Sequence, residues 1–314
     1  MASSQLFQAR DHGNGVLEII AVFPDMNAEH PAMQAVVTLA RRFPTLILTL
    51  ESGASIDASG FGKLIEASGM TRLFVATSDQ QAHPFARASI RTYATPREAL
   101  LAVRGEEIAR HIVAKMEAIP ELHSQAFDLL QKLNQPSLSF EKMGETIAKE
   151  PGLATQILKT ANSAFFMRRS KVDTIPAALT LLGLEGLKQI LVVNVFKGLT
   201  GYFGAQKEVL DHGRVCAQLA VHLAELKKVP RTNLAKIRLG GLLHDVGSLA
   251  LVFFYPKEYG EVRALMKTQT KRSYEAELAV FGIEHQALGK QLAEKWGFPD
   301  YLCRIIGDHH AMSD

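Results

Sequence analysis

The sequence predicts two domains, an α/β domain at residues 1–105 followed by an all-α domain at residues 106–314. The length of 314 residues exceeds that of one typical domain of roughly 100–200 residues. Up to about Arg104, short β-type runs alternate with helix-length amphipathic runs, a pattern typical of an α/β layer arrangement. Beyond Glu106, apolar residues recur at three- and four-residue spacing, which predicts helices.

Runs bounded by Gly, Pro and Asp define the elements expected in the first domain. The expected strands are VLEIIAVF (16–23), TLILTL (45–50) and RLFVAT (72–77), and the expected helices are AMQAVVTLARRF (32–43), GFGKLIEASG (60–69) and PREALLAV (96–103). We place the domain boundary at 105–110, where RGEEIARHIVAKM begins a charged helix. This stretch has no Gly/Ser-rich composition, which favours a connecting helix over a flexible linker.

Local signals divide the second domain into helices. Ser139, followed by Lys142-Met143, opens one helix, and Glu150-Pro151-Gly152 separates it from the next. Thr174 is placed as an N-cap, with Pro176 in the first turn. Gly183 is expected to separate IPAALTLL from LEGLKQILVVNVF.

Composition and charge narrow the class of protein. The chain is 47% apolar and 21% charged, which is typical of globular proteins and excludes a disordered chain. A net charge of +3 without a basic stripe makes nucleic acid an unexpected ligand. Cys216 and Cys303 cannot form a disulfide framework, the N-terminus lacks signal-peptide features, and the apolar runs are too short to span a bilayer. We therefore expect a cytoplasmic protein with no membrane partner.

Histidines and carboxylates gather in the last third of the chain with spacings that suit a metal site. Glu208 and His212 are spaced i, i+4 and share one helix face, and His244 and Asp245 are adjacent in GLLHDVG. Downstream, His285 begins HQALGKQLAEKW, and His309 and His310 stand near the end of the chain. Such a mixed imidazole and carboxylate set suits one or two ions of Fe, Mn, Zn or Ni more than Ca or Mg.

Each of these residues also has a structural interpretation. A single His-Asp pair is often incidental, Glu208 beside Lys207 is typical of a surface carboxylate, and His309 and His310 could be a solvated tail. His222 is interpreted as a surface or core histidine and is left out of the site. The joint pattern favours a site, because histidines on successive helices are hard to attribute to packing alone.

Several motifs resemble the HDOD domain, a relative of the HD-type metal phosphohydrolases, from about Ile119 to His310. They are IPELHSQAFDLL, EPGLATQILKTANSAFF with Glu150 in place of an Asp, TIPAALTLLGLEGLKQIL, GLLHDVG, EHQALGKQLAEKWGFP and DHH, in the order of the family. The resemblance implies an all-α bundle with a groove beneath the His-Asp helix. It also implies a signalling or output module that binds a protein or a nucleotide.

The resemblance extends to the metal ligands of the related HD-GYP enzymes, which hydrolyse cyclic di-GMP. The positions that match such ligands are Glu208, His212, His244, Asp245, His285, His309 and His310. The chain departs from these enzymes at Ser248, where they carry a lysine that contacts phosphate, and it has no Gly-Tyr-Pro segment. Hydrolysis also needs positive charge to neutralise the phosphate, which here would fall to Lys290 or Arg304. We therefore expect binding without efficient turnover.

The first domain resembles a STAS domain, the fold of anti-sigma-factor antagonists. The resemblance lies in LILTLESGASIDASGFGKLIEASG, where Ile56-Asp57-Ala58-Ser59-Gly60 follows a strand, and in RTYATPREALLAV. In that family, a Ser or Thr at the position of Ser59 accepts phosphate at a helix N-terminus, where an anion is favoured. The alternative is that Asp57 and Ser59 cap a helix in an α/β domain that has no switch.

Together these observations predict a bacterial signalling protein with a STAS-like input and an HDOD output. Its expected partner is a signalling protein or a cyclic nucleotide, with homodimerisation also open. The alternative function is a metal-dependent phosphohydrolase acting on a cyclic dinucleotide or nucleotide. A third interpretation is a structural scaffold with fortuitous histidines.

Overall fold

The computed structural model describes residues 8–21, 31–51, 72–77, 90–119, 125–133, 140–163, 172–202 and 207–311. The chain divides into two compact units, each treated by itself below. The first comprises Met1–Glu107 with Phe281–Ile283, and the second comprises Ile108–Val280 with Glu284–Asp314.

The first unit contains a mixed five-stranded sheet with strand order β1-β2-β3-β4-β5. Strand β1 pairs antiparallel with β2, and the other neighbouring strands are parallel. The described elements of this unit are β1 Gln8–Asp11, β2 Val16–Ala21, α1 Pro31–Ala40, β3 Thr45–Leu50, β4 Arg72–Ala76, β5 Thr92–Tyr93 and the first half of α4 Pro96–Glu117.

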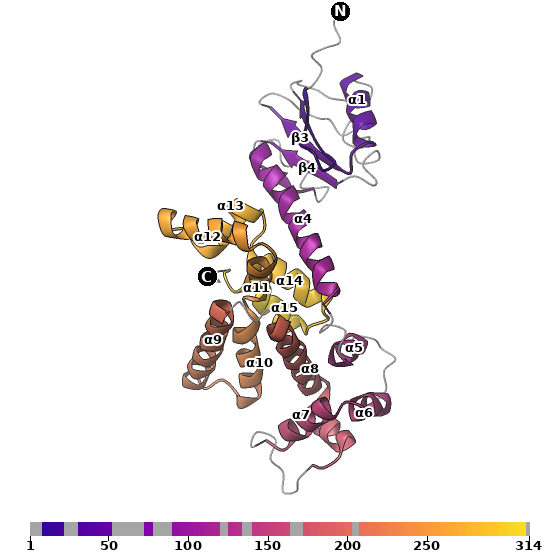
Figure 1. The fold of residues 1–314 in the computed structure, drawn as a ribbon, viewed down its shortest axis with the longest axis vertical. Helices are drawn as coiled ribbons and strands as arrows, with labels where there is room; N and C mark the ends of the chain where they lie inside the picture. The colour runs from indigo at the N-terminus through magenta and orange to yellow at the C-terminus, as the bar shows by residue number, and fades with distance from the viewer. Residues whose placement is uncertain are drawn as a thin grey trace, which may run out of the picture. The chain divides into compact units, whose positions relative to one another are not determined.

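Both faces of this sheet are covered by a helix (Figure 1). Met33 and Val36 of α1 pack against Leu46 and Leu48 of β3. On the opposite face, Ala99 and Val103 of α4 pack with Ile47 and Phe74. Alternate residues of one strand therefore enter two separate cores, which explains why TLILTL is apolar at nearly every position.

The structure confirms the α/β prediction at β2, β3, β4 and α1, and it differs in two places. Strand β1 was not expected, because the sequence QARD is polar and all four residues are exposed. The helix at 96–103 does not end before the charged segment but continues through Gly105 as the single helix α4. The predicted segment around Ser59 lies outside the described residues, so the STAS resemblance stays a prediction.

The second unit is helical throughout the part of the chain that the structure describes. After the second half of α4, its helices are α5 Gln125–Lys132, α6 Phe140–Ala148, α7 Pro151–Ala161, α8 Ile175–Tyr202, α9 Lys207–Leu226, α10 Arg231–Leu243, α11 Val246–Phe254, α12 Pro256–Gln269, α13 Ser273–Phe281, α14 His285–Lys295 and α15 Asp300–Asp308. The expected helix boundary at Glu150-Pro151-Gly152 is confirmed, with Pro151 as the first residue of α7, and so is the helix start after Thr174. Gly183 breaks α8 with φ 65° and ψ 179°, also as expected.

Two stretches have the length and apolar composition of a bilayer span, Ile175–Leu199 and Asn233–Phe254. This corrects the expectation that the apolar runs are too short. Gly183 interrupts the first stretch, and His244 with Asp245 interrupts the second between α10 and α11. A buried core helix meets the same criteria, so these stretches do not by themselves indicate a membrane protein.

Candidate metal centre

Four helix ends and one helix face present the histidines and the aspartate. His212 lies in the second turn of α9. His244 follows the last residue of α10, and Asp245 directly precedes α11. His285 is the first residue of α14, and His309 follows the last residue of α15. Helix ends leave side chains free to converge from different directions, and here the ends of sequence-distant helices meet.

Small residues let α9 and α10 approach closely. The two helices lie side by side in Figure 1. A Cβ added at Gly213 would lie 2.7 Å from the carbonyl oxygen of Leu242, and one added at Gly241 would lie 2.7 Å from the Cα of Ala217. No larger residue fits at either position without displacing backbone. This close packing places His212 beside His244, with ring centroids 5.2 Å apart.

The glycine that follows the His-Asp pair has a similar role between α11 and α14. A Cβ at Gly247 would overlap the backbone carbonyl of His285 and would lie 2.8 Å from the backbone nitrogen of Gly289. Gly247 therefore allows the start of α11 to touch the start of α14. That contact brings Asp245 to His285, which is forty positions further along the chain.

The carboxylate of Asp245 stands at the centre of the cluster and faces two pairs of imidazoles. Its Oδ2 atom lies 3.5 Å from Nε2 of His212 and 3.5 Å from Nε2 of His244. Its Oδ1 atom lies 3.3 Å from Nε2 of His285 and 3.5 Å from Nε2 of His309. Nε2 of His310 lies 3.1 Å from Nε2 of His285, so this ring joins the second pair.

Three of the rings are held by hydrogen bonds from their Nδ1 atoms. Nδ1 of His244 donates to the carbonyl of Gly241 at 2.9 Å, and Nδ1 of His309 donates to the carbonyl of Ile306 at 2.9 Å. A carbonyl only accepts, so Nδ1 carries a proton, and Nε2, which faces Asp245, is the nitrogen that could bind an ion after losing its own proton. This arrangement is typical of metal-ligating histidines.

Glu277 holds the third ring and was not found by sequence reasoning. Its Oε2 atom accepts from Nδ1 of His285 at 2.5 Å and from the backbone nitrogen of His285 at 2.9 Å. The hydroxyl of Tyr259 donates to the other oxygen at 3.3 Å. Glu277 is fully buried, and nothing in the helical run SYEAELAVF sets it apart from a surface glutamate.

The pKa values in the cluster reflect its crowding. Burial would raise the pKa of Asp245, but the hydrogen bond from His309 and the charges of the surrounding imidazoles lower it to about 2. Burial lowers the pKa of His285, but the hydrogen bond and charge of Glu277, together with the charges of Asp245 and Glu284, raise it above its usual value. Burial and the neighbouring His309 and His285 lower the pKa of His310 to about 4. Burial also lowers the pKa of His244.

Glu208 is the predicted ligand that the structure does not bring to the cluster. Its side chain is 85% exposed and accepts a hydrogen bond from Arg263 at 3.0 Å. Glu208 lies one turn before His212 on α9, in the first turn of the helix. The i, i+4 spacing correctly predicted that Glu208 and His212 share a helix. The side chain of Glu208, however, does not reach the other residues of the cluster.

The donor separations fit a metal centre. Ligands that bind a tetrahedral zinc ion at about 2.0–2.3 Å lie about 3.3–3.6 Å from one another. The four distances from Asp245 oxygens to imidazole nitrogens, 3.3 to 3.5 Å, fall in this range. The residues could therefore hold metal at this cluster: the donor atoms of His285, His309 and His310 lie within 4.8 Å of one another, as do those of His244, Asp245 and His309.

The phosphate-binding lysine of the resembled enzymes has no counterpart at the same position. Ser248 is buried in α11 and bonds through its hydroxyl to Tyr259. The aliphatic part of Lys290 lies against Gly307 of α15, and Arg304 is exposed. On the His310 side, the ring of Tyr274 lies 5.0 Å from His310, and its hydroxyl accepts from Arg272 at 3.0 Å. Sequence reasoning did not consider Arg272.

The fold and the cluster define a helical domain with a cluster of histidines and an aspartate that could hold a metal ion. Residues 119–312 match the HDOD domain family, and because this is more than half of the chain, the protein belongs to that family. An uncharacterized protein of Treponema pallidum (strain Nichols) is 22% identical over 218 residues, which are 69% of this chain and 42% of that protein. The chain spans less than half the length of the curated relatives it matches.

Two solved structures are among those that the chain matches. One, from Shewanella amazonensis and named "Putative phosphohydrolase", is 21% identical and has a TM-score of 0.44, over 64% of this chain and 71% of that chain. The other, from Marinobacter aquaeolei and named "Putative signal transduction protein", is 16% identical and has a TM-score of 0.43, over 98% of this chain and 78% of that chain.

Proposed function

We propose that this protein is an HDOD signalling module that acts in the cytoplasm. Its output domain would be organised around a divalent transition-metal ion. One observation carries the proposal: each oxygen of Asp245 faces the Nε2 atoms of two histidines. The side chains that would hold metal are His212 and His244 on one side and His285, His309 and His310 on the other, with Asp245 between them. Imidazole and carboxylate donors suit Fe, Mn, Zn or Ni.

Metal in this position would bind together helices that are far apart in sequence. When bound, it supplies positive charge that offsets the carboxylates of Asp245 and Glu277 and can polarise a phosphate oxygen. Glu277 orients His285, and the backbone carbonyls of Gly241 and Ile306 orient His244 and His309. The chain's own residues thus position the donors before any ion binds.

Binding rather than turnover is favoured by the chemistry at the position of the missing lysine. Ser248 is neutral, buried and bonded to Tyr259. Phosphoryl-transfer chemistry depends on positive charge placed where negative charge develops, and a neutral serine supplies none. We therefore propose that the domain acts by binding another macromolecule.

An exposed apolar stripe on α9 supplies a surface for such binding. Val215, Leu219, Leu223 and Leu226 are 53–66% exposed and, at spacings of three and four residues, lie on one helix face. The occupant we propose is a second copy of this chain, with its α9 antiparallel. Val215 and Leu223 lie equally far on either side of Leu219, as do Asp211 and Lys227, so an antiparallel pair matches apolar with apolar and acid with base.

A metal-dependent phosphohydrolase is the second candidate, because a carboxylate that faces four imidazoles could help to hold two ions, as two-metal hydrolytic sites do. Arg272, held beside His310 through Tyr274, is the cation that could replace the missing lysine. We expect the parent chain to bind metal tightly. We also expect the metal-loaded parent chain to hydrolyse cyclic di-GMP no faster than the Asp245→Ala variant does. Metal-dependent hydrolysis that is lost in Asp245→Ala and in Arg272→Ala would overturn the binding assignment in favour of the enzyme.

A further inference from the structure

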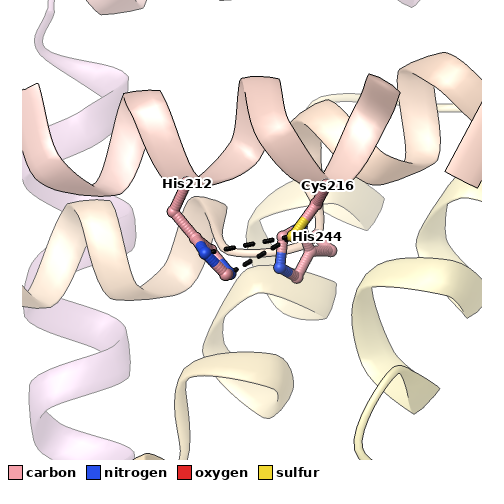
Figure 2. Close-up of side chains that lie close together, drawn as sticks. All are labelled: His212, Cys216 and His244. Carbon is pink, nitrogen blue, oxygen red and sulfur yellow. Dashed lines mark hydrogen bonds between the residues drawn. The ribbon is translucent and has the colours of Figure 1, made fainter. Parts of the chain in front are cut away.

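Cys216 stands beside the His212 and His244 side of the centre. It lies one turn after His212 on α9, and its Sγ atom lies 3.5 Å from Nε2 and 3.9 Å from Nδ1 of that ring. One ligand atom from each of Cys216, His212 and His244 lies within 4.8 Å of the other two. Figure 2 shows the three side chains pointing toward one another, two from α9 and one from the end of α10.

The thiol is held in place by the same close packing that positions the histidines. A Cβ at Gly241 would lie 3.1 Å from the backbone carbonyl carbon of Cys216, so α10 approaches α9 at this residue. The i, i+4 spacing keeps the side chains of His212 and Cys216 on one helix face. The side of α9 that carries the thiol therefore faces the end of α10.

The separations are compatible with side chains that bind one tetrahedral ion. Nitrogen and sulfur bound to one zinc ion at about 2.0–2.1 and 2.3 Å lie about 3.5 Å apart. The Sγ atom of Cys216 lies 3.5 Å from Nε2 of His212, and Oδ2 of Asp245 lies 3.5 Å from Nε2 of both His212 and His244. Cys216, His212 and His244 together offer two nitrogens and one sulfur, and the Asp245 carboxylate lies beside the two imidazoles.

We propose that Cys216 is a ligand of the ion on the His212 and His244 side, and that its thiolate makes this half of the centre selective for zinc. The proposal rests on the proposed metal centre and specifies its chemistry. Thiolate is a soft donor that favours zinc, whereas the His285, His309 and His310 side offers only imidazole and carboxylate. The thiol loses its proton to solvent when the ion binds. The three side chains would hold the ion through two nitrogens and one sulfur.

Cobalt substitution tests the ligand directly, because cobalt bound to a thiolate shows a sulfur-to-metal charge-transfer band in the near ultraviolet. The full chain is stripped with chelator, reloaded with Co²⁺, and compared with Cys216→Ser and Cys303→Ser. Cys303 is a matched control, since its buried thiol donates to the carbonyl of Phe298 at 3.5 Å, away from the cluster. We expect the band in the parent chain and in Cys303→Ser, and its loss in Cys216→Ser.

Zinc affinity, measured by chelator competition, gives a second readout. Cys216→Ser should weaken zinc binding by at least about tenfold, with an unchanged circular dichroism spectrum. A parent chain that binds cobalt without the band, or a Cys216→Ser variant with unchanged zinc affinity, overturns the role of Cys216 and leaves the centre standing. A parent chain that binds no metal at all overturns the proposed function itself, so the two failures are distinguishable.

Discussion

Glu277 and His285 form a buried pair, 0% and 1% exposed, in which Oε2 of the glutamate lies 2.5 Å from Nδ1 of the imidazole. The pair joins α13 to the first residue of α14 and aims the other ring nitrogen at Asp245. A carboxylate buried this deeply is costly unless it is satisfied, and here His285 and Tyr259 satisfy it. The pair therefore positions His285 as a candidate metal ligand.

Replacing this carboxylate should weaken metal binding without removing a ligand. We expect Glu277→Gln to lower zinc or manganese affinity by about 10–100-fold, because an amide supports the ring less strongly than a carboxylate. Chelator competition measures the change. Glu275→Gln on the same helix is the control, since Glu275 accepts from the exposed backbone of Arg272. Equal affinity in both variants would contradict the positioning role of Glu277.

Metal affinity should rise with pH between about pH 6 and pH 8. Glu277 raises the pKa of His285, so this ring holds a proton that an ion must displace, and higher pH removes the competing proton. His310, with a pKa of about 4, and Asp245, with a pKa of about 2, do not change charge in this range. Calorimetry in buffers of different ionisation enthalpy should show proton release at pH 7, reduced in Glu277→Gln. Affinity that is flat across this range would disagree with the prediction.

Gly247 should tolerate no side chain. A methyl group there would overlap the carbonyl of His285, so we expect Gly247→Ala to destabilise the helical unit by about 1–3 kcal/mol and to weaken metal binding. Gly260 in α12 is the matched control, because a Cβ there would meet no atom within 4 Å. Thermal unfolding followed by circular dichroism should show a lower Tm for Gly247→Ala and an unchanged or higher one for Gly260→Ala. Equal Tm values would refute the close contact between α11 and α14.

The apolar stripe on α9 should mediate self-association. We expect Leu219→Glu to shift the chain from dimer to monomer in sedimentation equilibrium, because the proposed two-fold axis places this residue opposite itself. Leu278→Glu is the control, since Leu278 is 47% exposed on α13 and outside the stripe. A parent chain that is already monomeric at high concentration would exclude the second copy as occupant.

Local signals predicted much of the helical unit, and its site only in part. Pro151 and Gly183 act through fixed or permissive backbone angles, so their effects could be read without tertiary information. His244, Asp245 and His285 could be singled out because residue type and motif mark them. Their convergence, however, depends on Gly213, Gly241 and Gly247 permitting close helix contacts, which spacing alone does not reveal.

Sequence reasoning expected Glu208 at the cluster, and it missed Glu277, Cys216 and strand β1. Glu208 and Glu277 are both glutamates on helices, yet the first is 85% exposed and the second fully buried. Cys216 carried a signal that was overlooked, its i, i+4 spacing from His212. Strand β1 has no apolar alternation because all four of its residues are exposed, so pairing with β2 defines it.

The metal content of the Asp245→Ala variant tests the central claim most directly. The parent chain, Asp245→Ala and the surface control His222→Ala are reloaded with zinc or manganese, and bound metal is counted by inductively coupled plasma mass spectrometry. Because Asp245 is shared by both halves of the centre, the account predicts about two ions per chain in the parent and the control, and loss of most of both in Asp245→Ala. Equal metal content in Asp245→Ala and the parent would contradict a centre organised around this carboxylate.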